Sequence, residues 1–520
     1  MPVPTDASPY DEIDYPGHAF PNTHPARVAA VGILRGMNPG PIERCRVLEL
    51  GCGDGANLIP MAYELPHARF LGIDLAARPI TRGRERIGRL GLSNVELEAM
   101  DLMDVEEDMG QFDFIIAHGL YSWVSEVVRH RVLEICARHL ASTGIAFVSY
   151  LAEPGNQIRD VLRQLLLRFS DHTADVGARV RRARQLMGIF AAAPVGGPAF
   201  HELARAFAEE FEKLDDGVIY HDWLAPENAA MYVTGFVDVA SRLGLAFLGE
   251  AEYFMMRYEH DPLLAAAREE LVRLEEQDIV MKEQLLDFLR GRRFRQTLLC
   301  HGNVLLSRPE ARRVFGLAAS SQLALVDEPN LSTSELAEFR SPRGNSLRID
   351  HPVVKTVLAR LGGEWPRAIP FAELLTGARE AAGRTDAGSG QGDADVLGAV
   401  LLACYGASYA EFFAHAPRFT LTAGERPRAS AVARDEIDRT PLVTNLRHEN
   451  LRIDDALGAA LLRLLDGTRD RRQIVDSLTE MVASGSVPSP KVQGGDVREA
   501  IASQLDDSLK GLAHSALLEA

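Results

Sequence analysis

The feature that most constrains the fold is a short apolar run that leads into three glycines. It reads CRVLELGCGDGANLIP, from Cys45 to Pro60. The apolar run predicts a strand that ends at Leu50, and the residues from about Asn57 predict a helix. Glycines between a strand and a helix let backbone amides approach a ligand without a Cβ in the way, and a helix start favours a negative group. We therefore expect a ligand site at this turn.

Strand and helix patterns alternate after this turn, which predicts an α/β fold with a parallel, doubly wound, Rossmann-like sheet. The apolar runs FIIA and IAFV are typical of strands that are buried on both faces. Further strands are expected within 69–75, 94–101, 112–120 and 144–151, and helices within 57–65, 79–91 and 127–140. In such a sheet, ligands bind at the carboxyl ends of the strands.

Changes of pattern along the chain predict several domains. An arm or lid with one helix is expected at 1–45, and a catalytic domain at 46–305. Because strands are expected again at 245–256 and 294–302, the helical block at about 156–243 is interpreted as an insertion in that domain. A mixed middle domain follows at 306–415. The last domain, at 416–520, is expected to be winged-helix-like, with two short helices around the turn DGTRDR.

Composition limits the partners. The 520 residues include 73 acidic and 56 basic side chains, a net charge of −17, which argues against binding to a nucleic-acid backbone. The five cysteines lie far apart and include no CxxC pair, so neither a disulfide framework nor a metal site is expected, and a reducing cytoplasm is the simple interpretation. No signal peptide and no membrane span are expected.

Acidic residues follow the first three predicted strands. Glu49 precedes the glycine turn formed by Gly51, Gly53 and Gly55, whose GxGxG spacing differs from the GxGxxG of dinucleotide enzymes. Asp74 ends the second strand, where an acid can accept both ribose hydroxyls of a nucleoside; the alternative is a helix cap. Asp101 ends the third strand and can accept from an adenine amino group; the alternative is a simple loop acid.

Together these motifs resemble the class I S-adenosylmethionine-dependent methyltransferases. The resemblance runs through VLELGCGDGANL, GIDL, MD and FDFIIAHGLYSWV. More narrowly, the arm YDEIDYPGHAFPNTHPARVAAVGILRGM and the segment DWLAPENAAMYVTGFVDVASRLGLAFLGEAE are similar to bacterial enzymes with a methyltransferase regulatory domain, a group that includes rickettsial protein-lysine methyltransferases. The tail TNLRHENLRIDDALGAALLRLLDGTRDR is similar to their C-terminal domain.

The resemblance implies S-adenosyl-L-methionine (AdoMet) as cofactor. It implies that the glycine turn surrounds the methionine part, that Asp74 binds the ribose and that Asp101 lies near the adenine. His118 would lie beside the reactive sulfonium. The full set of cofactor-binding residues is expected to be Glu49, Gly51, Gly53, Gly55, Asn57, Asp74, Leu75, Asp101, Leu102, Ala117 and His118.

An amine acceptor must lose its proton before it attacks the methyl group, and a tyrosine, a histidine, a carboxylate or water can take it. The predicted catalytic residues are His118, Tyr121, Tyr150 and Tyr15, with Tyr10, His18 and Glu153 as further candidates by position. The tyrosines can instead be packing residues, and His118 can simply bond to the backbone. Trp123 is interpreted as a core or cofactor-covering aromatic residue rather than a cation-binding ring.

The acceptor is expected to be a protein lysine. The loop SYLAEPGNQ departs from the Asn-aromatic-Pro-Gly pattern frequent in the family, so a small metabolite or a peptide natural product stays open as the acceptor. The absence of an Asp/Asn-Pro-Pro-Tyr motif argues against amino groups of bases or glutamine. A third hypothesis is a regulatory protein that binds the cofactor without catalysis. A homodimer is a possible assembly.

Overall fold

The computed structural model describes residues 17–170, 175–259, 261–384, 390–489 and 496–520. Its largest sheet has the strand order β3-β2-β1-β4-β5-β8-β7, and the short β6 also pairs with β5. The first five strands are parallel. Strand β8 runs antiparallel to β5, and β7 runs antiparallel to β8. The strands are β1 Arg46–Leu50, β2 Arg69–Asp74, β3 Val95–Ala99, β4 Phe112–Ala117, β5 Leu140–Ala152, β6 Ala230–Met231, β7 Leu245–Glu250 and β8 Phe294–His301.

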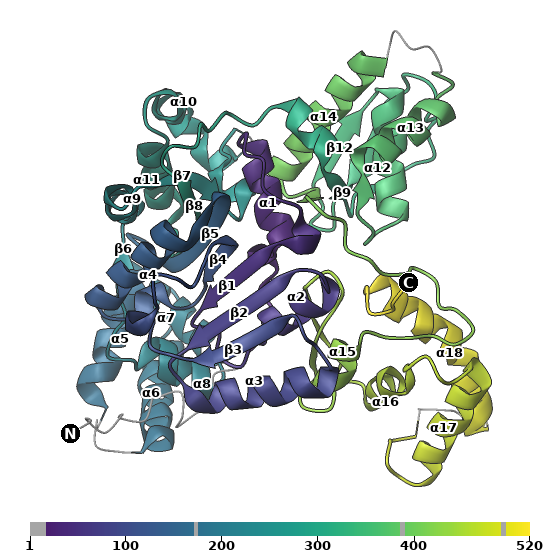
Figure 1. Ribbon diagram of the computed structural model, residues 1–520, viewed down its shortest axis with the longest axis horizontal. Helices are drawn as coiled ribbons and strands as arrows, with labels where there is room; N and C mark the ends of the chain where they lie inside the picture. Colours follow the sequence, from purple (N-terminus) through teal and green to yellow (C-terminus); the bar gives the residue numbers. More distant parts are fainter. Residues whose placement is uncertain (1–16, 171–174, 260, 385–389, 490–495) are drawn as a thin grey trace.

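The expected doubly wound sheet is confirmed, and β7 and β8 complete it as the sequence predicted (Figure 1). Buried apolar side chains of the parallel strands fill both faces. Two differences concern the end of the sheet. The expected strand at 245–256 stops at Glu250 and continues as a 3-10 turn, Tyr253–Met256. The segment 226–244, which helical periodicity also predicts to be a helix, becomes helical only at Val233, because Ala230–Met231 extends along β5.

Helices flank the sheet and form the insertion. Helix α1 contains a buried run of small apolar residues, and the helical block between β5 and β6 forms its own core around Leu166, Met187 and Phe211. The helices up to β8 are α1 Pro25–Leu34, α2 Leu58–Glu64, α3 Ala77–Leu90, α4 Glu126–His139, α5 Gln157–Phe169, α6 Val176–Ala191, α7 Ala199–Phe211, α8 Asp216–Val218, α9 Val233–Arg242, α10 Arg268–Gln277 and α11 Ile279–Arg290.

Two further cores follow the sheet. The middle segment packs around Phe339, Leu358 and Leu397. Its elements are β9 Ala318–Ser320, β10 Ala324–Leu325, β11 Ala337–Arg340, β12 Ser346–Ile349, α12 Pro352–Gly363, β13 Ile369–Pro370, α13 Phe371–Ala381, α14 Gly390–Gly406 and β14 Glu411–Phe413. The C-terminal segment has a separate core and comprises α15 Ala431–Glu436, β15 Leu442–Thr444, β16 Asn450–Arg452, α16 Ala456–Leu464, α17 Arg471–Ala483 and α18 Val497–His514.

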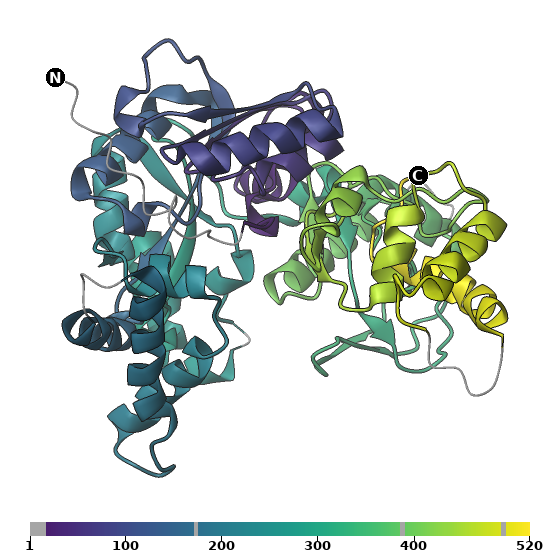
Figure 2. The same ribbon diagram turned by 90° about the horizontal axis from the view of Figure 1, so that it is seen from below.

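The helical block and the C-terminal helices lie on opposite sides of the molecule. Figures 1 and 2 show α5–α7 on one side of the sheet and α16–α18 on the other. Helix α15 contacts both α2 and α3 of the methyltransferase sheet. The C-terminal segment therefore docks next to the elements that carry the glycine turn.

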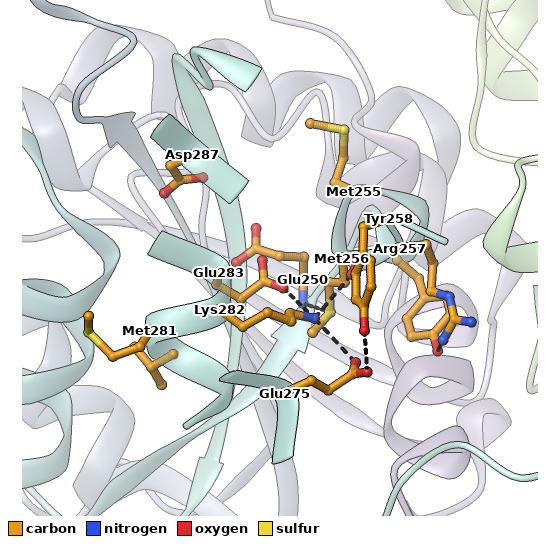
Figure 3. A network of polar contacts seen from close by, with 12 residues as sticks. Glu250, Met255, Met256, Arg257, Tyr258, Glu275, Met281, Lys282, Glu283 and Asp287 are labelled. Carbon is orange, nitrogen blue, oxygen red and sulfur yellow. Dashed lines mark hydrogen bonds and ion pairs between the residues drawn. The ribbon is translucent and has the colours of Figure 1, made fainter. Parts of the chain in front are cut away.

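A buried ionic network fixes α11 against β7 and β8. Lys282 of α11 is buried, and its ammonium group donates to Met256 O at 3.1 Å and lies 3.1 Å from Glu283 (Figure 3). Arg295 of β8 is also buried and bonds to Glu250 at 2.5 Å and to Asp287 at 2.8 Å. The network holds together the antiparallel end of the sheet and the helix that covers it.

Candidate cofactor site and acceptor cavity

A cavity of about 690 Å³ opens at the carboxyl ends of the parallel strands. The segments that follow β1, β2, β3 and β4 supply one half of its wall, as the sequence predicted for a ligand site. The other half comes from the helical block and from the start of β8. Of the expected cofactor-binding residues, the cavity is lined by Glu49, Gly51, Gly53, Asn57, Asp74, Leu75, Asp101, Leu102 and His118.

The glycine turn adopts backbone conformations that other residues rarely adopt. Gly51, Gly53 and Gly55 have φ angles of +75°, +56° and +72°. A Cβ on Gly53 would meet no atom within 4 Å, whereas one on Gly55 would lie 2.9 Å from Leu97. Gly53 therefore leaves open space on the cavity side. Gly55 does not line the cavity, and its close contact with Leu97 makes it a packing glycine rather than a ligand contact.

Asp74 connects the ends of β1 and β2. One carboxylate oxygen accepts from Gly53 N and the other from Ala76 N, both at 2.8 Å. Ala76, not Asp74, is the N-cap residue of α3, so the helix-cap alternative does not hold. A carboxylate oxygen can accept more than one hydrogen bond. Asp74 therefore shapes the turn and keeps acceptor capacity at the cavity wall.

The third strand tip supplies a polar and an apolar contact. Asp101 caps the 3-10 turn Leu102–Asp104 and accepts from Met103 N at 2.9 Å. Leu102 is buried beneath it, and Leu75 on the neighbouring tip is 65% exposed. All three line the cavity. An acid and two apolar side chains in one cavity wall can together bind a flat, partly polar ring such as a purine.

Glu49 and Asn57 form a buried pair behind the glycine turn. Asn57 Nδ2 donates to Glu49 Oε1 at 2.7 Å, whereas Oε2 has no hydrogen-bond partner among the described residues. Both side chains are buried and both line the cavity. Burial raises the pKa of Glu49 to about 8. An unpartnered carboxylate oxygen at this place fits a cationic group of a ligand.

The raised pKa of Glu49 gives a prediction for the free protein. Between the ordinary pKa of a glutamate and about pH 8, Glu49 holds a proton in the folded protein that the unfolded chain has released. Stability therefore falls as pH rises through this window. Glu49→Gln cannot ionise. Between pH 5 and 8, we expect the free energy of unfolding of the wild type to fall by about 2 kcal/mol or more relative to that of this variant. Denaturant unfolding of the ligand-free proteins measures the difference. Parallel pH profiles of the two proteins would contradict it.

His118 lies at the tip of β4, inside the cavity wall. Its ring is 3.8 Å from that of Phe20, centroid to centroid, and its Nδ1 has no hydrogen-bond partner among the described residues. Burial, assisted by His18, lowers the pKa of His118 to about 3. The imidazole is therefore neutral near pH 7 and a weak proton acceptor. Ala117, which precedes it, is buried in the core and does not line the cavity.

Two of the expected tyrosines, Tyr121 and Tyr150, do not line the cavity. Tyr150 is fully buried, its hydroxyl lies 3.1 Å from Thr297 Oγ1, and its ring stacks on Phe236. Tyr121 packs edge-on against the same phenylalanine. Burial raises the pKa of both phenols well above the ordinary value. Both side chains are core residues, because Tyr150 of β5 and Tyr121 of the 3-10 turn Tyr121–Trp123 pack against Phe236 of α9. Tyr15 and Tyr10 lie outside the described residues.

The second half of the cavity wall comes from residues that the sequence analysis did not identify. Trp223 is held between Arg159 and Phe211, with the guanidinium 4.7 Å above the ring and the phenyl group edge-on at 5.0 Å. Two acidic residues share this wall, which is lined by Phe207, Glu210, Phe211, Leu214, Val218, Asp222, Trp223, Arg293 and Phe294. On α7 the lining residues recur at helical spacing. Residues that pack a helix into a core recur at the same spacing, so this pattern does not identify a cavity wall.

Two further lining residues keep buried polar atoms without a partner among the described residues: Nε1 of Trp123 and Oδ1 of Asn156. Trp123 therefore belongs to the cavity wall, as a cofactor-covering aromatic residue would. Asn156 lies within the segment SYLAEPGNQ, which departs from the pattern frequent in the family. Buried polar atoms are usually hydrogen-bonded in folded proteins, so these two atoms point to a polar ligand.

Sequence families match three parts of the chain. The family described as "Methyltransferase domain" matches residues 47–144, and "Predicted methyltransferase regulatory domain" matches residues 215–301. "PKMT, C-terminal winged helix domain" matches residues 425–517. One uncharacterised protein of Rickettsia prowazekii is 27% identical over 93% of this chain and 87% of its own length. A second is 30% identical over 46% of this chain and 96% of its own length.

A solved structure matches nearly the whole chain. PKMT2 from Rickettsia typhi is 26% identical, superposes with a TM-score of 0.85, and the match covers 97% of this chain and 99% of that one. That protein has also been solved in complex with AdoHcy. The chain belongs to the PKMT family of AdoMet-dependent methyltransferases. The PKMT-type winged-helix domain confirms the predicted character of the C-terminal segment.

The residues of this PKMT-family chain fit AdoMet. Three features of the cavity are compatible with a ligand of this kind: the open space at Gly53, the acceptor capacity of Asp74 and the unpartnered oxygen of Glu49. Within the described residues, no cluster of three or more His, Cys, Asp or Glu side chains is arranged to hold a metal ion. The same part of the chain contains no helix with the length and apolarity that a membrane crossing requires.

Proposed function

We propose that this methyltransferase modifies the lysine side chains of a protein. The observation that carries the proposal is the shape of the cavity, which runs from the glycine turn to a wall of aromatic rings that also carries two carboxylates, Glu210 and Asp222, and the guanidinium groups of Arg159 and Arg293. Apolar rings accommodate the alkyl part of a lysine, and carboxylates attract its ammonium group. The similarity to PKMT2, whose abbreviated name denotes a protein-lysine methyltransferase, supports the same acceptor.

The cofactor half of the site works by positioning. We assign the ribose hydroxyls to Asp74, the adenine to Asp101 with Leu75 and Leu102, and the methionine part to Glu49 with Gly51, Gly53 and Asn57. When bound, AdoMet supplies a methyl group on a cationic sulfur. The protein contributes orientation of the two reactants and exclusion of water, which together account for large rate enhancements in bimolecular reactions.

The acceptor half of the site must deliver a neutral amine. His118 is a weak base because its pKa is lowered to about 3, so we assign proton loss to water rather than to this imidazole. Glu210 is exposed and bonds to Arg293 at 2.9 Å, which places solvent next to this part of the wall. The neutral His118 and the ring of Trp123 then line the path of the methyl group without carrying charge.

Removing the acidic charge of the acceptor wall tests this assignment. The double variant Glu210→Gln/Asp222→Asn is expected to lower kcat/KM for a lysine-containing protein by about 10-fold or more, since one or two attractive charge interactions near a surface contribute about 1–2 kcal/mol. AdoMet affinity should stay unchanged. The matched control is Glu209→Gln, an exposed neighbour paired with Arg205 on the same helix. Equal kinetics of the double variant and this control would contradict the assignment.

The acceptor class is tested by labelling. The enzyme is incubated with methyl-labelled AdoMet and bacterial lysate, and proteins are separated from small molecules. We expect label in the protein fraction and, after acid hydrolysis, in methylated lysine. Label found only among small molecules would contradict a protein acceptor and favour a metabolite or a peptide product. Tight cofactor binding with no label in either fraction would favour the regulatory hypothesis.

We further propose a cytoplasmic location, with the protein substrate and a second copy of the chain as partners and no nucleic acid. The location is supported by the cysteines: all five are free and buried, as in proteins of reducing compartments. The acidic net charge of −17 supports the exclusion of nucleic acid. The proposed domain boundaries remain those predicted from the sequence.

A further inference from the structure

One tight loop of the C-terminal domain lies next to the glycine turn. The loop spans residues 445–449 between β15 and β16. Asn445 shapes it, because its side-chain oxygen accepts from the backbone amides of both Arg447 and Glu449 at 2.9 Å. His448 at its tip has a φ angle of +61° and is buried. A non-glycine residue in this left-handed region is strained, and such strain gathers at functional sites.

His448 contacts the residue that holds Glu49. Its Nε2 lies 2.9 Å from Asn57 Oδ1. The backbone amide of Phe20 donates to the same atom at 2.9 Å. Because a backbone N–H can only donate, that atom is the amide oxygen, and His448 must be the donor in its own bond. The other end of the Asn57 amide, Nδ2, then donates to Glu49 Oε1 at 2.7 Å and to Thr23 Oγ1 at 3.0 Å.

The same hairpin also fixes the arm that borders the cavity. Asn450 Nδ2 donates to Ala19 O at 2.7 Å, and Ala19 N donates to Asn450 Oδ1 at 3.2 Å. The arm residues Gly17, His18 and Phe20 line the cavity. A Cβ on Gly17 would lie 2.8 Å from Asp54 Oδ1, so the arm runs directly over the glycine turn. The hairpin thus touches both the arm and Asn57.

The surroundings of His448 keep its ring neutral. It is fully enclosed, and the groups that face it, His24 and Arg27, are basic or cationic; burial and these neighbours lower its pKa well below the ordinary value. Its Nδ1 has no hydrogen-bond partner among the described residues. A neutral imidazole carries one ring proton, and the contact with Asn57 places that proton on Nε2.

We propose that His448 is a positioning residue for AdoMet binding. By donating to Asn57 Oδ1 it holds the amide with Nδ2 on Glu49, so that the C-terminal winged-helix domain completes the cofactor site of the methyltransferase domain. The contact joins residues that are 391 positions apart in the chain. The proposal rests on the assignment of Glu49 to the methionine part of AdoMet.

The test compares two substitutions in the full-length protein. His448→Leu removes the donor, whereas His448→Gln keeps an amide donor near the position of Nε2. By calorimetry, we expect His448→Leu to weaken AdoMet binding about 10-fold, the effect of one lost hydrogen bond to a polar site residue. His448→Gln should bind within about 3-fold of the wild type. Arg452→Ala is the matched control, since this residue of β16 is exposed and its side chain pairs with the exposed Asp454.

A second ligand separates positioning from general loosening of the structure. 5′-Methylthioadenosine has the adenosine part of AdoMet but no amino-acid part. If His448 acts through Asn57 and Glu49, His448→Leu should leave the affinity for this ligand unchanged. Equal losses for both ligands, no loss for AdoMet, or failure of His448→Gln to restore binding would each overturn the proposal.

The roles of Glu49 and of His448 are distinguished by different variants. If the wild type binds AdoMet and Glu49→Gln binds it equally well, the assignment of Glu49 falls, and the proposal for His448 falls with it. If Glu49→Gln weakens AdoMet binding but His448→Leu does not, only the role of His448 is overturned. Thermal unfolding of each variant confirms that the compared proteins are folded at the temperature of the measurement.

Discussion

Asp74→Ala is expected to weaken AdoMet binding by about 100-fold or more. Hydrogen bonds to a charged acceptor contribute about 1.5–3 kcal/mol each, and an acid at this strand tip is placed to accept from both ribose hydroxyls. The substitution also removes the acceptors for Gly53 N and Ala76 N, so the glycine turn loses its support. Calorimetric titration with AdoMet and with AdoHcy measures the effect.

Two companion variants make the expected result specific. Asp74→Asn keeps a similar shape and one carbonyl acceptor but loses the charge, and we expect an intermediate loss of about 10-fold. Asp104→Ala removes an exposed acid from the neighbouring turn that does not line the cavity, and it should bind like the wild type. Wild-type affinity in Asp74→Ala would contradict the ribose assignment, whatever the acceptor proves to be.

Arg295→Met is expected to destabilise the protein by about 3–5 kcal/mol. The guanidinium is buried and bonds to three carboxylates, those of Glu250, Glu283 and Asp287, at 2.5–3.2 Å. Removing this guanidinium leaves three buried carboxylates with Lys282 and the more distant Arg292 as cationic neighbours, and breaking a buried ion cluster in this way costs far more than the cluster contributes net. Denaturant unfolding, followed at the transition of the methyltransferase domain, measures the loss.

The control for this prediction is an exposed ion pair. Arg242 on α9 is 73% exposed in its side chain and pairs with Asp238 on the same helix. Arg242→Met should change stability by less than about 0.5 kcal/mol. Arg295→Lys should recover only part of the loss, because an ammonium group cannot replace a planar fork that binds several carboxylates. Equal stability of Arg295→Met and Arg242→Met would contradict a structural role for the network.

The cofactor half of the site was accessible from the sequence because its signals are local. Gly51, Gly53 and Asp74 follow consecutive strands, and a parallel sheet brings the carboxyl ends of its strands to one edge. The glycine pattern itself predicts a close backbone approach. Gly55 and Ala117 were less well predicted: they belong to the same motifs, but one packs against Leu97 and the other is buried behind His118. A motif identifies the turn but not whether each of its residues faces the cavity or the core.

The tyrosines are a second case in which the sequence did not show which way a side chain faces. Tyr150 occupies the last third of a long strand, and alternate residues of a strand face opposite layers. Its hydroxyl finds a partner in Thr297 of β8, a strand more than a hundred residues away. Because β8 pairs with β5 only after the whole insertion, nothing near Tyr150 in the sequence reveals that it faces the core instead of the cavity.

By itself, the sequence determined the doubly wound sheet and the strand tips that line the cavity, because strand period, glycine turns and terminal acids act over a few neighbouring residues. The cofactor was implied by the resemblance to a methyltransferase family. Only the tertiary structure decided the acceptor wall and the contact of His448 with Asn57. An apolar stripe on α7 reads the same whether it lines a cavity or fills a core, and a hydrogen bond across 391 residues depends on how separate domains dock. Those features arise from packing between distant segments, which local patterns do not encode.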